Sequence, residues 1–247
     1  MIAFGVFGFS NLSSALQRRI ADGASTDTAL NELKDMRRQL AQTDDLNKRA
    51  AISQRAEALI KNAADKMTSE QAANEMSALA KFVAPLFEQR RAFDAAAQEF
   101  FGNDNDWARY IDTQETLALG RERLARVRQR SKAVYQTMDS LVAKAATMIR
   151  NNDTSLGISV AAFKGFHSSY VAKAQKFKDV DESQTKMFAR IDDVLAMLQT
   201  EWGKWSKDTD GVIQWESNEL LKKFLVINND IDTLSAQLGE REKALLQ

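Results

Sequence analysis

The chain has 247 residues with 34 basic and 34 acidic side chains, so its formal net charge is zero at pH 7. A neutral chain has no overall electrostatic attraction to nucleic acid or to an acidic membrane, and such attraction would have to come from a local patch. The sequence contains no cysteine, which excludes disulfides, thiolate zinc sites and cysteine nucleophiles. A single proline and ten glycines among many helix-forming residues predict long helices joined by few turns.

Apolar residues spaced alternately three and four apart recur along most of the chain, a pattern typical of helices that pack along a seam. The pattern starts after Thr26 and continues to about Met67, with a polar interruption at residues 43–45. A capping box of Thr68 and Gln71 predicts the start of the next helix. Pro85 predicts a kink in that helix, and the polar residues 102–105 predict its end.

The most regular seam belongs to a helix predicted over about residues 105–150. At about 1.5 Å per residue such a helix would measure ~70 Å, which exceeds the width of a compact domain of this size. We therefore expect an elongated molecule. The predicted seam residues are Leu117, Gly120, Leu124, Val127, Ser131, Val134, Met138, Leu141, Ala145 and Met148.

Turns are predicted at residues 151–154 and 208–211, with a weaker break at 178–181. The segments between and after them continue the helical spacing, and no segment shows the alternation of a strand. The predicted seam residues are Leu156, Val160, Phe163, His167, Tyr170, Ala174 and Phe177, then Met187, Ile191, Val194, Leu198 and Trp205, and finally Leu220, Phe224, Ile227, Ile231, Leu234 and Leu238.

Short turns favour antiparallel neighbours. The sequence therefore predicts an all-α protein, an elongated up-and-down bundle of five to seven long helices with coiled-coil-like seams. The bundle is expected over residues 23–247, either as one unit or as two bundles that share the long central helix. An apolar and amphipathic segment over residues 1–22 precedes it.

The N-terminal segment lacks the basic start of an intact secretory signal, and the chain has no apolar run of the length that spans a membrane. Two interpretations remain open for it. The segment could anchor the protein on a membrane surface, as amphipathic segments do, or it could cover an end of the bundle. The candidate membrane or partner contacts are Phe4, Phe7, Phe9, Leu12, Leu16, Arg18 and Arg19.

Catalytic patterns are missing from the sequence. The sole histidine, His167, lies between Phe163 and Tyr170 on a predicted seam, which favours a core position, with a pH-sensitive core residue as the second interpretation. The acidic loop at residues 206–217 resembles a calcium loop but has Ser217 where the bidentate glutamate belongs, so an acidic turn is expected. We predict no enzyme activity, no cofactor and no metal.

Basic and aromatic side chains offer further candidates. Arg123, Arg126 and Arg130 lie on one side of the long seam and form either a solvated face or an anion-binding patch. Nucleic acid is not expected as a partner, because the chain is not basic overall and aromatics are not interleaved with the arginines. Arg90 interrupts an apolar seam and is a candidate polar core residue. Trp202, Trp205 and Trp215 flank the turn at residues 208–211, and they are expected either to pack around it or to sit at a membrane interface or in a partner site.

The sequence thus favours a non-catalytic helical scaffold that binds a protein partner or itself, with a possible membrane contact through residues 1–22. One alternative is the ligand-sensing bundle of an extracytoplasmic receptor, in which a small molecule would bind at a polar pocket around Arg90. Another is a helical pore-forming or secreted toxin component, with the apolar run 156–163 as its inserting tip. In the absence of a signal peptide or membrane span, the default expectation is a cytoplasmic or peripheral membrane location.

Overall fold

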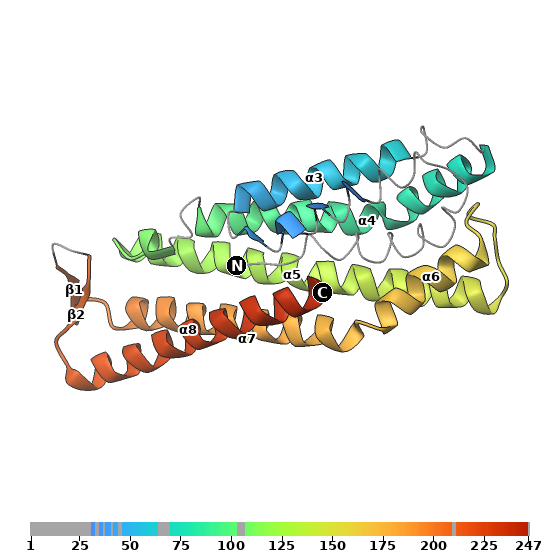
Figure 1. The fold of residues 1–247 in the computed structure, drawn as a ribbon. Helices are drawn as coiled ribbons and strands as arrows, with labels where there is room; N and C mark the ends of the chain where they lie inside the picture. The colour runs from blue at the N-terminus through green and yellow to red at the C-terminus, as the bar shows by residue number, and fades with distance from the viewer. Residues whose placement is uncertain are drawn as a thin grey trace.

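The computed structural model describes residues 31–32, 35–36, 38–40, 42–43, 46–63, 70–102, 107–208 and 211–246. Long helices dominate this part of the chain, which confirms the predicted all-α bundle (Figure 1). The elements are α3 (Leu46–Ala63), α4 (Glu70–Phe101), the 3₁₀ turn η4 (Trp107–Tyr110), α5 (Gln114–Arg150), α6 (Val160–Val171), α7 (Ala174–Thr200), β1 (Trp205–Lys207), β2 (Ile213–Trp215) and α8 (Asn218–Leu246).

Helix α5 runs lengthwise through the middle of the molecule, with α3 and α4 on one side and α6, α7 and α8 on the other (Figure 1). Successive rods reverse direction: α4 is antiparallel to α5, α6 and α7 return along α5, and α8 returns along α7 (Figure 1). This is the predicted up-and-down order. The 37 residues of α5 make it about 55 Å long.

The seam predicted for the long central helix is confirmed residue by residue. The ten buried residues of α5 are Leu117, Gly120, Leu124, Val127, Ser131, Val134, Met138, Leu141, Ala145 and Met148. Side chains three and four positions apart lie on one face of a helix, so this row forms a continuous apolar strip. The strip packs against α4, α6 and α7 and joins the two sides of the bundle into one core.

The predicted start of this helix, near residue 105, is wrong. Helix α5 begins at Gln114, because Thr113 caps it: its hydroxyl accepts from the Thr116 backbone at 3.1 Å, and its backbone donates to the Thr116 hydroxyl at 2.9 Å. The residues before the cap form η4, whose Tyr110 is buried and stacks on Phe100. The Thr113 cap therefore sets the start of the helix, although apolar residues at helical spacing begin earlier in the sequence.

The break in the following rod is also misplaced in the prediction. Helix α6 begins at Val160, where the Ser159 hydroxyl accepts from the backbone of Ala162 at 3.1 Å, so Leu156 lies outside the helix and is exposed. The chain departs from the helix after Val171, and α7 then continues through residues 178–181. The polar stretch there is tolerated because Val180 within it is buried in the core.

A short hairpin that the sequence pattern did not predict joins α7 to α8. Strands β1 and β2 pair in antiparallel fashion with Trp205 opposite Trp215, so Trp205 lies on a strand and not on the predicted helical seam. The Trp205 indole donates to the Leu198 carbonyl at 2.9 Å and meets Trp202 edge-on, while Trp215 packs on Phe224. The three tryptophans therefore pack around the turn, as expected.

Candidate functional site

A buried cluster of charges lies between α3 and α4, around Arg90. The predicted polar core position of this residue is observed: Arg90 is 6% exposed, and its Nε donates to the Asp94 carboxylate at 2.8 Å one helical turn further along α4. The guanidinium carbon of Arg90 also lies 5.6 Å from the centre of the Phe93 ring. A buried arginine is stable when it is paired in this way.

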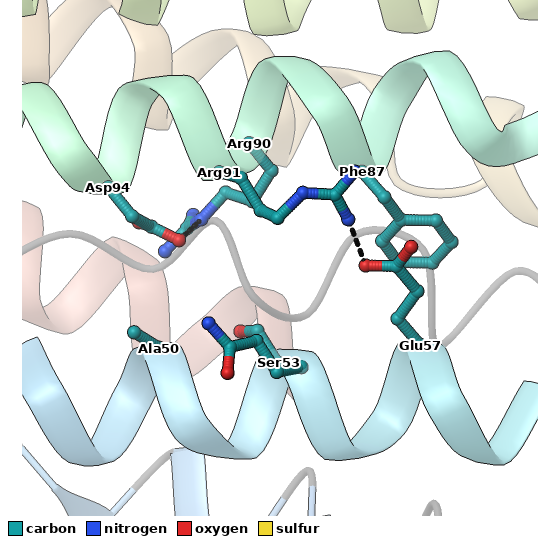
Figure 2. A pocket seen from close by; sticks show the side chains of 8 residues that line it. Ala50, Ser53, Glu57, Phe87, Arg90, Arg91 and Asp94 are labelled. Atoms are coloured by element: carbon teal, nitrogen blue, oxygen red, sulfur yellow. Dashed lines mark hydrogen bonds and ion pairs between the residues drawn. The ribbon is translucent and has the colours of Figure 1, made fainter.

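The charges border a cavity of about 100 Å³ between the two helices (Figure 2). Across it, Arg91 of α4 donates to the carboxylate of Glu57 on α3, which is 8% exposed. The Ser53 hydroxyl is buried and makes no hydrogen bond within the described part of the chain. The lining residues are Ala50, Ser53, Gln54 and Glu57 from α3, and Phe87, Arg90, Arg91 and Asp94 from α4.

This cavity combines two guanidinium groups, two carboxylates, a hydroxyl and an aromatic wall. Guanidinium groups bind carboxylates in a planar, two-pronged manner, and carboxylates accept from ammonium groups. The residues offer binding groups for a small polar molecule. Among the described residues of the lining, two side chains are basic and two are acidic.

The predicted basic patch is largely paired with acidic groups. Arg123 and Arg126 both approach the Glu99 carboxylate, at 3.2 and 3.1 Å, while Arg130 is exposed on the same helix. The Arg123 guanidinium also donates to the Tyr110 hydroxyl at 2.9 Å, and this hydrogen bond raises the pKa of Arg123 above its usual value. The pairing favours the solvated-face interpretation, and anion binding there stays a prediction.

One of these arginines also helps to close the end of α4, since Arg123 donates to the Glu99 carbonyl at 3.5 Å. Tyr110 donates to the Glu99 carbonyl at 3.0 Å, and Arg109 donates to the Phe100 carbonyl at 2.9 Å. The last carbonyls of a helix lack partners within the helix and carry partial negative charge, so basic and hydroxyl donors stabilise them. Arg123, together with Arg109 and Tyr110, therefore has a structural role at the junction of α4, η4 and α5.

The other predicted residues are His167 and the contacts of the N-terminal segment. His167 is half-buried on α6, whose buried face is formed by Phe163, Gly165 and Phe166, and it is not among the residues that line the cavity. Seven predicted contacts of the N-terminal segment lie outside the described residues, and their membrane role stays a prediction. They are Phe4, Phe7, Phe9, Leu12, Leu16, Arg18 and Arg19.

A second surface, between α7 and α8, was not predicted. It is an open groove of about 470 Å³, in which Arg190 of α7 pairs with Asp193 at 3.0 Å and with Asp230 of α8 at 3.1 Å. The sequence signal was weak because most residues that line the groove are polar and therefore resemble an ordinary solvent-facing side. They are Lys186, Ala189, Arg190, Asp193, Asp230, Thr233 and Leu234.

Helix α8 beside this groove is incompletely covered. The five apolar seam residues before Leu238 are only half-buried, whereas Leu238 and Leu245 near its end are buried. Val226 is 60% exposed and lies four residues before Asp230, which lines the groove, so the two share a face of the helix. The half-buried seam residues are Leu220, Phe224, Ile227, Ile231 and Leu234.

Within the described residues, no group of three or more His, Asp or Glu side chains is arranged to hold a metal ion. None of the helices in the described part of the chain has the length and apolar character needed to cross a membrane. Comparison with known proteins finds no matching protein-family model, curated protein or solved structure.

Proposed function

We propose that this chain is a non-catalytic scaffold that associates with a second copy of itself through the face formed by α7 and α8. The observation that supports this proposal is the half-covered seam of α8, beside the groove that α8 forms with α7. Apolar residues at regular helical spacing usually mark a face that is buried against another helix. Here the residues of the row before Leu238 are only half-buried in the described structure.

Two such faces packed together would form a four-helix bundle. Helices α7 and α8 form an antiparallel hairpin, and two hairpins packed face to face make a four-helix bundle. Each helix has nearly 30 residues and is therefore ~40 Å long and ~10 Å wide, so the hairpin presents a face of roughly 800 Å². Stable interfaces bury about this area on each partner.

The charges on the groove favour a second copy over a strongly acidic or basic partner. Lys186 and Arg190 are basic, and Asp193 and Asp230 are acidic, so the rim carries equal numbers of each sign. In a two-fold interface the same patch meets itself, and a mixed patch can place each charge opposite its complement. The zero net charge of the chain adds no long-range repulsion between copies.

Analytical ultracentrifugation of the full chain tests the proposal. We expect a monomer–dimer equilibrium in the micromolar range, and Val226→Glu should weaken it at least about tenfold, because a charge on the packed face loses its hydration. Val171→Glu is the matched control, since Val171 is 56% exposed but lies at the end of α6. A monomer at all concentrations up to about 100 µM would contradict the proposal, as would equal effects of the two variants.

A further inference from the structure

The face of α7 that lines the groove carries its charges in a definite order. Lys186 and Asp193 are separated by two helical turns, and both line the groove, so they share one side of the helix. Their midpoint falls between Ala189 and Arg190, which line the groove as well. In an antiparallel pair of identical helices centred on this midpoint, each lysine faces the aspartate of the other copy. The charge order of α7 is therefore complementary to itself when two copies of α7 meet in opposite directions.

Helix α8 carries the same kind of order on its groove side. A row of side chains at steps of three and four runs from the exposed Lys223 to the exposed Glu240, and residues in steps of this kind share one face of a helix. Reversal of the row about its midpoint, between residues 231 and 232, places Lys223 opposite Glu240. The same reversal places Val226 opposite Gln237. The members of the row are Lys223, Val226, Asp230, Thr233, Gln237 and Glu240.

The midpoints of the two helices lie at nearly the same level of the hairpin. Arg190 of α7 contacts Asp230 of α8 at 3.1 Å, and each residue is within two positions of the midpoint of its own helix. Because α7 and α8 are antiparallel, the two midpoints differ in level by only ~1.5 Å. One two-fold axis at right angles to both helices can therefore pass through both midpoints. The charges of α7 and those of α8 support the same axis independently.

The other way to stack two hairpins fits these charges less well. An axis parallel to the helices would lay α7 over the partner's α8 and bring equal levels together. Arg190 lies level with Asp230, and α8 runs opposite to α7 (Figure 1). Asp193, three residues further along α7, would then lie level with the partner's Ile227, three residues back along α8. A carboxylate packed against apolar side chains loses hydration without gaining a cation.

We propose that the two copies pack antiparallel about this axis, with α7 on α7 and α8 on α8, and that Lys186 of each copy pairs with the partner's Asp193. The inference rests on the self-association proposed above and adds its orientation and the charges that determine it. Within the chain Lys186 contacts Glu182 at 2.8 Å, and Asp193 contacts Arg190 at 3.0 Å. The Lys186 and Asp193 side chains are 60% and 49% exposed, so these intrahelical pairs are weak and exchange readily. Charges of this kind select the orientation of a partner more than they add affinity.

Charge reversal tests the pairing, with analytical ultracentrifugation of the full chain as the measurement. Lys186→Asp and Asp193→Lys each place like charges opposite one another at two points, so each variant alone should dimerise about fivefold to tenfold more weakly. An equimolar mixture of the two variants should restore the affinity, because every lysine again meets an aspartate. Lys164→Asp is the matched control and should leave the affinity unchanged, since Lys164 is exposed on α6. A mixture as weak as the single variants would overturn the antiparallel pairing and leave the self-association standing.

Cross-linking is a second measure of the orientation, because the chain has no cysteine of its own. Ala189→Cys places a thiol beside the axis, where the two copies should approach within the Cα separation of about 7 Å that a disulfide can span. Glu182→Cys is the matched control, because it lies two turns away and its two copies would be ~22 Å apart along the helices. Oxidation should join the Ala189→Cys chains into covalent dimers and leave the Glu182→Cys chains single. Equal cross-linking of both variants would overturn the orientation, whereas a wild-type chain that stays monomeric would overturn the self-association itself.

Discussion

Helices α5 and α8 both carry a regular apolar seam, yet the two seams have different surroundings. All ten seam residues of α5 are buried, because α4 packs on one side of the helix and α6 and α7 on the other. Helix α8 packs mainly against α7, and the five seam residues before Leu238 are only half-buried. Periodicity therefore identifies the apolar face of a helix, while the number of neighbours decides how completely that face is covered.

The difference has an energetic consequence. Fully burying a leucine side chain contributes about 1.5–3 kcal/mol, and a deletion inside a closed core adds the unfavourable energy of a cavity. The same deletion on a half-covered seam lowers the free energy of unfolding by less, because water already reaches the site. The α5 seam should hold most of the stability of the described bundle, and the first half of the α8 seam should hold little of it until a further surface covers it.

The largest expected effect is that of truncating a leucine on the closed seam. Leu124 on α5 is fully buried, so Leu124→Ala should lower the free energy of unfolding by about 3–4 kcal/mol. Leu234→Ala on the half-covered seam of α8 should lower it by about 1 kcal/mol. Urea unfolding at about 1 µM protein measures both, below the concentration range expected for self-association. Equal losses would show that the α8 seam is covered in solution.

A smaller effect is expected from adding a methyl group to a glycine on each helix. A Cβ at Gly120 of α5 would lie 2.8 Å from Tyr110, so Gly120→Ala should displace η4 and lower the free energy of unfolding by about 1–3 kcal/mol. A Cβ at Gly239 of α8 meets no atom within 4 Å. Gly239→Ala should therefore raise the stability by up to about 1 kcal/mol, because alanine favours the helix. Thermal unfolding of both variants tests whether the two changes in stability have opposite signs.

The α5 seam was predictable because its period is unbroken and its helix has neighbours on both sides, so that the local pattern and the tertiary packing agree. Its start was not predicted, because the cap depends on a Thr113–Thr116 pair whose second member is not the glutamate or glutamine of the usual capping box. The hairpin was missed because its strands have three residues each, too few for an alternating pattern to appear.

The cavity was predictable in part. Arg90 stood out because a charged residue on an apolar seam must find a partner. Its neighbour Glu57 did not stand out, because a glutamate on a helix is ordinarily solvated, and its burial depends on how α3 lies against α4. The α7–α8 groove left no clear signal, since its two edges come from separate helices and most of its lining residues are polar.

The smallest expected effect concerns the carboxylate of Asp181 on α7. Burial, and then repulsion from Asp139 of α5, raises the pKa of Asp181 above its ordinary value of 3.8. The ionised form is thus disfavoured in the fold, and stability is lost as the pH rises through the pKa of the folded state. Asp181→Asn should raise the free energy of unfolding by a few tenths of a kcal/mol at pH 7, allowing for solvent screening, and by almost nothing near pH 3.

Urea unfolding at both pH values measures this change. Asp192→Asn is the control, because it breaks the 2.9 Å ion pair with Arg121 and should lower the free energy of unfolding at pH 7. A loss at pH 7 for Asp181→Asn as well would mean that the Asp181 carboxylate is a stabilising partner, and that the α7 side of the core tolerates charge better than its burial indicates.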